Sequence, residues 1–173
     1  MGCVGLTYCN AILTIAYMKV VMDADCLIKL TKANLKELVC SAIAVVIPVA
    51  VKMEVVDNAG PHPDAEMIQG NIKSKQLTVK GGQAGHYEGE EAALDLFRRG
   101  SYDALCSDDR RFIRRLRILN IPYITPAVFV AVLLKQGRLT AMEATEKLAL
   151  LAPYISDDEY ATVRLVIENW RTS

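Results

Sequence analysis

Short apolar runs of strand length alternate with segments of helical periodicity along most of the chain, and this alternation constrains the fold more than any other feature. Within 26–42, for example, apolar residues recur at helical spacing through Leu27, Leu30, Leu35 and Leu38. The runs expected to form strands are 19–23, 42–48, 77–80, 103–107 and 121–126. Strands separated by helices imply right-handed crossovers and parallel pairing. The sequence therefore predicts an α/β fold with three α/β/α layers and a central parallel sheet.

Length, composition and charge exclude several classes of protein. A chain of 173 residues that is 52% hydrophobic and 23% charged is typical of one folded domain and excludes intrinsic disorder. Twenty basic and twenty acidic residues cancel, so any binding of a polyanion must be local. The five cysteines are odd in number and lack CxxC spacing, which argues against a disulfide framework and a zinc site. We therefore expect a cytoplasmic protein.

The segment 1–17 is uncharged and differs from the rest of the chain. It lacks a basic n-region, and its polar residues make it a poor and short membrane span, so a membrane anchor is the less favoured interpretation. We expect either an extra packed element or an over-extended start with the functional chain beginning at Met18. Residues 18–173 are expected to form a single domain with C-terminal helices.

Acidic residues recur where predicted strands end and the following helices begin. Parallel strands direct their carboxyl ends to one edge of the sheet, which is where ligands bind in open α/β folds. Two pairs of acids follow strands directly, and three more lie early in helices from which they could reach the same edge. The acids are Asp23 and Asp25 after the first strand, Asp108 and Asp109 after the fourth, Glu54 after the second, and Glu90 and Glu91 after a glycine-rich stretch.

Carboxylates held close together repel and raise one another's pKa unless cations neutralise them. Oxygen ligands of this kind favour Mg²⁺ or Mn²⁺, and two such ions about 3.5–4 Å apart would activate water and stabilise the leaving oxygen of a phosphodiester. Taken singly, each acid has a simpler interpretation as a helix cap or a first-turn acid. Their recurrence at this edge favours a metal site, to which Glu54 contributes the weakest signal.

Four segments resemble the successive blocks of PIN domain nucleases, which include VapC-type toxins and stand-alone PIN proteins. The segments are VVMDADCLIKL, VIPVAVKMEVV, GEEAALDL and ALCSDDRRFIRRLRILNIPYITP, and the resemblance runs from about residue 19 to about residue 139. It implies a metal-dependent endoribonuclease in which Mg²⁺ or Mn²⁺ is held by Asp23, Glu54, Glu90 or Glu91, and Asp108 or Asp109. It also implies an RNA substrate and leaves an antitoxin protein and a homodimer open as partners.

The resemblance has departures. Many members of the family carry Ser or Thr where Asp25 stands. The last two blocks offer doubled acids, and the spacing from Glu90 to Asp108 equals that from Glu91 to Asp109. Spacing therefore does not decide which member of each pair is the ligand.

Arginines crowd the helix expected directly after Asp109. Residues four apart share one side of a helix, so Arg110 with Arg114, and Arg111 with Arg115, form a basic stripe beside the acids. We take Arg110, Arg111 and Arg114 as candidate contacts to nucleic acid phosphates. A solvated face neutralised by neighbouring acids is an equally good interpretation.

Other motifs point to structure. Thr140 with Glu143, and Ser156 with Glu159, have the spacing of capping boxes that start the last helices. Lys29, with Lys32 and Lys36, adds a weaker basic face. His86 is expected to be an exposed loop histidine.

Two alternative functions remain open. DAD at 23–25 and SDD at 107–109 are similar to the first and last motifs of haloacid-dehalogenase-type phosphatases, in which Asp23 would be the nucleophile. The residues after the first motif and the presence of Glu54 and Glu90 argue against it. The other alternative is a non-catalytic PIN-like module that binds RNA or protein.

Overall fold

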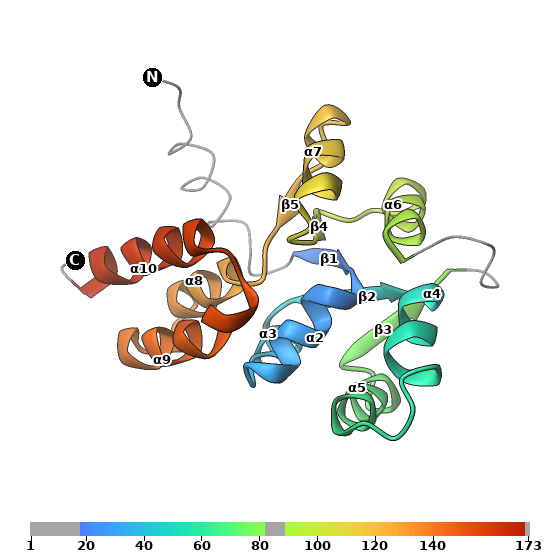
Figure 1. Cartoon of the computed structure of the whole chain (residues 1–173), viewed down its shortest axis with the longest axis horizontal. Helices are drawn as coiled ribbons and strands as arrows, with labels where there is room; N and C mark the ends of the chain where they lie inside the picture. Colours follow the sequence, from blue (N-terminus) through green and yellow to red (C-terminus); the bar gives the residue numbers. More distant parts are fainter. Residues whose placement is uncertain (1–17, 82–88, 172–173) are drawn as a thin grey trace.

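The computed structural model describes residues 18–81 and 89–171. The segment 1–17 and the predicted loop histidine His86 lie outside the described residues, as do the remainder of 82–88 and residues 172–173. Within the described residues, the predicted central sheet is present as five strands in the order β3-β2-β1-β4-β5 (Figure 1). Every neighbouring pair is parallel, which confirms the predicted α/β class. The strands are β1 (Lys19–Met22), β2 (Ala44–Pro48), β3 (Leu77–Lys80), β4 (Ala104–Cys106) and β5 (Tyr123–Ile124).

Helices cover both faces of the sheet and give the predicted three layers (Figure 1). The α-helices are α2 (Ala24–Lys32), α3 (Lys36–Ala42), α4 (Val49–Lys52), α5 (Pro63–Lys73), α6 (Gly89–Arg99), α7 (Arg110–Ile118), α8 (Val128–Lys135), α9 (Ala141–Leu151) and α10 (Asp157–Arg171). A π-helical segment η2 (Met53–Asp57) continues α4, and a 3₁₀ turn η3 (Ala152–Tyr154) follows α9.

The alternation of side chains along β1 divides the core in two. Val20 and Met22 belong to the larger cluster, which includes buried side chains of α2, α3 and α8 to α10. Val21, one residue on, faces the opposite side and packs with α6 and α7. Successive strand residues point to opposite faces, so a strand covered on both sides must be apolar throughout. The continuous apolar runs in the sequence have this cause.

The predicted helix over 26–42 is wrong in one respect, because the structure breaks it into α2 and α3. Asn34 adopts the left-handed conformation with φ +51° and reverses the chain between the two helices. Asparagine is among the few residues other than glycine that tolerate this conformation. The helical spacing of the leucines continues across the break, so periodicity alone does not reveal it.

The two predicted capping boxes have different outcomes. At the start of α9 both reciprocal hydrogen bonds between Thr140 and Glu143 are present, as predicted. At the start of α10 the Glu159 N–H donates to Ser156 Oγ at 3.3 Å, but the Glu159 side chain accepts a hydrogen bond from the backbone N–H of Ala127 instead. The second box is therefore only half formed, and its glutamate links α10 to the start of α8.

No helix in the described part of the chain is long and apolar enough to cross a membrane.

Leu133 in α8 is fully buried in the larger core, whereas Leu165 in α10 is 57% exposed. We predict that Leu133→Ala lowers the free energy of unfolding by about 2–5 kcal/mol, because it removes apolar contacts and leaves a cavity. Leu165→Ala, the same chemical change at the surface, should stay within about 0.5 kcal/mol of wild type. Urea denaturation followed by circular dichroism measures both, and equal losses would contradict the assignment of α8 to the core.

Candidate functional site

Asp23 is the residue where β1 ends and α2 begins. Its backbone N–H donates to the Cys106 carbonyl at 3.1 Å, and its Oδ1 accepts from the Cys26 N–H at 2.8 Å as the N-cap of α2. The Asp23 side chain also has a hydrogen bond with the Ser107 side chain. The residue is only 6% exposed. Asp23 is therefore a carboxylate held in a defined orientation at the carboxyl edge of the two central strands.

Burial is the main cause that raises the pKa of Asp23 from 3.8 to about 6, against the opposing effect of hydrogen bonds from Ser107 and Cys26. The negative charge of Asp108 raises this pKa further. Burial and a like charge both disfavour the ionised carboxylate. A cation beside Asp23 would reverse this effect.

Asp108 follows β4 and faces Lys29 of α2. The Lys29 Nζ donates to Asp108 Oδ2 at 2.6 Å, and the Asp108 side chain is 13% exposed. Burial lowers the pKa of Lys29, but the hydrogen bond to Asp108 and the charge of Asp108 outweigh it and raise that pKa. Asp25 lies 3.9 Å from the same amino group and is largely exposed. Lys29, expected to belong to a weak basic face, thus neutralises one of the site acids.

The two members of the second doubled pair have different surroundings. Asp109 is the N-cap of α7, since its Oδ1 accepts from the Phe112 N–H at 2.7 Å. The backbone N–H of Asp109 donates to Ser107 Oγ at 3.2 Å. Asp109 is thus engaged in starting α7, and Asp108 is the acid that lies with Asp23 and Lys29.

The first-turn glutamates of α6 also differ. Glu91 forms a two-pronged ion pair with the guanidinium of Arg115 in α7, which holds the pKa of Glu91 below its usual range. Glu90 is exposed at the start of the same helix. Glu54 of η2 lies against this end of α6, because its Oε2 would be 3.2 Å from a Cβ added at Gly89. Any larger residue at position 89 would press on the Glu54 carboxylate.

The structure thus brings Asp23 and Asp108 together, and it places Glu54 against Gly89 at the start of α6. Among residues 18–81 and 89–171, no three His, Cys, Asp or Glu side chains are close enough to hold a metal ion together. The four-acid metal site stays a prediction. The ligand atoms of this predicted site are carboxylate oxygens, which suit a hard divalent cation. The buried carboxylate among them, Asp23, has a pKa that burial and the negative charge of Asp108 raise.

Glu159 borders the same site and is absent from the predicted set. Its Oε1 accepts from the Ala127 N–H at 2.7 Å, and its side chain also has a hydrogen bond with Thr125. Burial is the main cause that raises the pKa of Glu159, and the charges of Asp108 and Lys29 also act on it. The one available signal, its spacing from Ser156, predicts a local cap rather than this contact.

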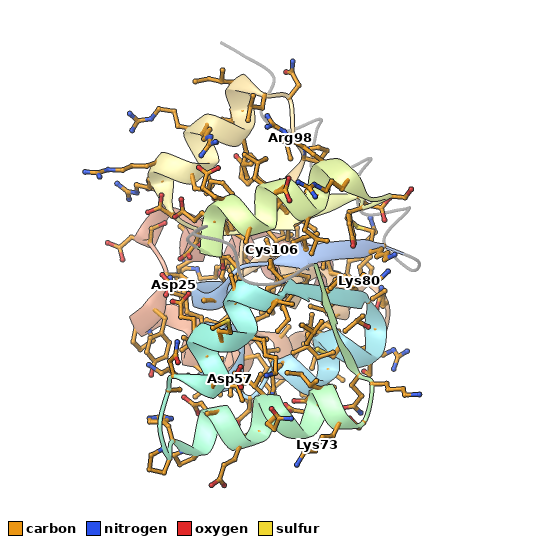
Figure 2. The ribbon with its side chains drawn as sticks, turned by 90° about the vertical axis from the view of Figure 1, so that its right-hand side faces the viewer. Asp25, Asp57, Lys73, Lys80, Arg98 and Cys106 are labelled. Atoms are coloured by element: carbon orange, nitrogen blue, oxygen red, sulfur yellow. The ribbon has the colours of Figure 1, made fainter. Side chains whose placement is uncertain are left out.

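A cavity of about 600 Å³ adjoins Asp108 between α7, β5 and α10. Two of the three arginines predicted to contact nucleic acid, Arg110 and Arg114, line this cavity, together with Arg117. Arg111 lies outside its lining. Figure 2 shows side chains with nitrogen tips extending outward from α7, so this helix forms a basic surface beside the acids.

The raised pKa of Asp23 predicts a pH dependence of stability. Between about pH 4 and pH 6 the unfolded chain releases this proton while the folded protein keeps it, so ionisation lowers stability as pH rises, by up to about 3 kcal/mol in total. Asp23→Asn keeps an N-cap acceptor and removes this titration. Its stability relative to wild type should therefore increase from pH 4 to pH 7, measured by urea denaturation in EDTA.

Asp103→Asn is the matched control, because Asp103 precedes β4 at the opposite edge of the sheet, where its Oδ2 accepts from the Lys19 N–H at 2.7 Å. A constant difference between Asp23→Asn and wild type across this pH range would contradict the burial argument.

Comparison with known proteins agrees with the fold. A family model described as a PIN domain matches residues 19–168, which is most of the chain. No curated protein and no solved structure matches it. PIN domains are generally nucleases, and they generally use divalent metals such as Mg²⁺ or Mn²⁺. The parallel sheet, the acids that follow β1 and β4, and this match together assign the chain to the PIN domain family.

Proposed function

We propose that this protein is a metal-dependent endoribonuclease that hydrolyses RNA phosphodiesters. The observation that carries the proposal is the buried carboxylate of Asp23, with its raised pKa and with Asp108 beside it, at the carboxyl edge of a PIN domain sheet. A carboxylate that is costly to bury is expected where a cation compensates for it. The proposed metal ligands are Asp23, Glu54, Glu90 and Asp108.

The second members of the doubled acids receive supporting roles in this proposal. Asp109 starts α7 and so fixes the direction in which its arginines extend. Glu91 joins α6 to α7 through Arg115 and holds the start of α6 near the site. Both remain alternative ligands, because each lies next in sequence to a proposed one.

The residues of the chain have distinct tasks in the proposed reaction. A bound Mg²⁺ or Mn²⁺ supplies charge neutralisation for the phosphodiester and activates water. Ser107 and the Cys26 N–H orient the Asp23 carboxylate, since both have hydrogen bonds to it. Lys29 donates a hydrogen bond to Asp108 and so orients that carboxylate at the site. Arg110, Arg111 and Arg114 contribute phosphate contacts along α7.

Family membership supports the proposed substrate and protein partners. RNA is the substrate, and an antitoxin protein or a second copy of the chain is a candidate protein partner. We propose a cytoplasmic protein with one catalytic domain over residues 18–173. Residues 1–17 are outside the described part of the chain and have no role in the proposal.

One observation favours the non-catalytic module as a second candidate. The Lys29–Asp108 ion pair partly neutralises the acidic site without a metal ion. The haloacid-dehalogenase-type alternative has no comparable support, because it leaves Glu54 and Glu90 without a role and the chain belongs to the PIN domain family.

We predict that Asp23→Asn and Asp108→Asn each reduce Mn²⁺-stimulated cleavage of single-stranded RNA by more than about 100-fold. Substitution of a residue that only hydrogen-bonds to a metal ligand already lowers metal affinity or activity about 10–100-fold. The measurement is the initial cleavage rate of a labelled RNA with Mn²⁺ and with EDTA. Asp103→Asn, which changes the opposite end of β4, should cleave at the wild-type rate. Wild-type rates for Asp23→Asn would refute the proposed nuclease.

Lys29→Met distinguishes the two candidates. If a metal ion and Lys29 compete for Asp108, removing the amine should tighten Mn²⁺ binding by up to about fivefold, which corresponds to an ion pair worth about 1 kcal/mol. Isothermal titration with Mn²⁺ measures this affinity directly. Lys32→Met, in the same helix but over the Tyr154 ring, is the control and should bind Mn²⁺ as wild type does. Absence of Mn²⁺ binding in both wild type and Lys29→Met would favour the non-catalytic module.

A further inference from the structure

The cavity between α7, β5 and α10 has a size and a composition that the proposed metal site does not use. Its volume of about 600 Å³ is within the range of pockets that enclose small ligands. Asp108 lies at its lining, so whatever occupies the cavity is next to the proposed reaction centre. The cavity is therefore suited to a part of the substrate adjacent to the reacting phosphate.

One wall of the cavity is basic. Arg110, Arg114 and Arg117 are four and three residues apart, which places them on one side of α7. The Arg117 guanidinium donates to the Tyr123 hydroxyl at 2.6 Å and 3.0 Å, and its charge lies 5.5 Å from the Tyr123 ring. Arg117 thereby fixes Tyr123 at the cavity wall, and Arg110 and Arg114 provide charge for a phosphate group.

The opposite wall accepts hydrogen bonds. It is formed by the start of α10 with Ser156, Asp158, Glu159 and Thr162. The Glu159 carboxylate is engaged with Ala127 and Thr125, and the Thr162 hydroxyl donates to the Asp158 carbonyl. The exposed Asp158 carboxylate is the acceptor best able to meet a ligand at this wall.

Apolar side chains lie between the two charged walls. They are Ile113 of α7, Val128 of α8 and Val163 of α10. An arginine wall, an apolar surface and an acceptor wall match the phosphate, the faces and the edge of one nucleotide. An acidic peptide would match only the arginines and would be repelled by Asp158.

We propose that this cavity binds one unpaired nucleotide of the RNA next to the cleaved bond, and that it prefers bases with an exocyclic amino group over uracil. Arg110 and Arg114 bind its phosphate, and Asp158 accepts a hydrogen bond from the amino group of adenine, cytosine or guanine. Uracil has carbonyl oxygens in place of that group, and their partial negative charge is repelled by the Asp158 carboxylate. This inference rests on the proposed function and adds substrate preference to it.

The test measures binding without cleavage. Fluorescence anisotropy is recorded with labelled five-nucleotide RNAs of adenine only or uracil only, on the full Asp23→Asn chain in EDTA. We expect this protein to bind the adenine RNA at least about fivefold more tightly than the uracil RNA. Adding Asp158→Asn should bring the two affinities together, because an amide can donate to uracil as well as accept from adenine.

Arg114→Gln in the same background tests the phosphate contact. It should weaken binding of both RNAs about fivefold. It should also reduce by about one the number of counterions released on binding, so that the affinity depends less on salt. Arg99→Gln is the matched control, because Arg99 is exposed at the far end of α6, pairs with Asp95 and contributes nothing to the cavity lining. It should leave both affinities unchanged. Circular dichroism verifies that each variant is folded.

Two results overturn this inference. One is equal binding of the two RNAs by the Asp23→Asn protein, and the other is an unchanged affinity in Arg114→Gln. Failure of the proposed function is seen separately in the cleavage assay. A wild-type protein that cuts RNA while Arg114→Gln binds normally refutes only the nucleotide cavity. A wild-type protein that binds RNA as described and never cuts it refutes only the nuclease.

Discussion

The burial of the Asp23 carboxylate is the constraint on which the site depends. In the strand order β3-β2-β1-β4-β5, β1 is central, so the residue that follows it is enclosed by its neighbours. A carboxylate there must be compensated, and the Cys26 N–H and the Ser107 side chain supply part of that compensation. The pKa of Asp23 is nevertheless raised to about 6, so burial outweighs these hydrogen bonds. The fold thereby maintains an acid in a state that a bound cation would stabilise.

Charges of both signs lie near Asp108, whose own charge acts on Asp23 and on Glu159. Asp108 and Glu159 contribute negative charge, and Lys29 contributes the positive charge that acts on both. Lys29 comes from the helix that Asp23 caps, so the same short segment supplies one acid of the site and the counter-charge of another, Asp108. In the proposed metal site, a divalent ion would compete with the Lys29 amine for Asp108.

Much of the fold could be predicted from the sequence because strands buried on both faces must be apolar throughout, and the helices between them are periodic. The edge where Asp23 and Asp108 lie follows from the same reasoning. The sequence does not show which of Asp108 and Asp109 faces the site and which caps α7, because the two are adjacent. The spacing from Glu90 to Asp108 also equals the spacing from Glu91 to Asp109. The sequence predicts a surface face for Lys29 and a local cap for Glu159, because the partners that the structure gives them, Asp108 and Ala127, are distant in sequence.

The arginines of α7 illustrate why a charged helix cannot be interpreted as one surface. Arg115 pairs with Glu91 and fastens α7 to α6, and Arg117 fixes Tyr123 on the opposite side. These two contacts set the rotation of α7 about its axis, while the Asp109 cap fixes its beginning. With the helix held in this way, Arg110 and Arg114 necessarily face the cavity beside Asp108. Helical spacing therefore separates Arg115, which pairs with Glu91 of α6, from Arg110, Arg114 and Arg117, which share the cavity side of α7.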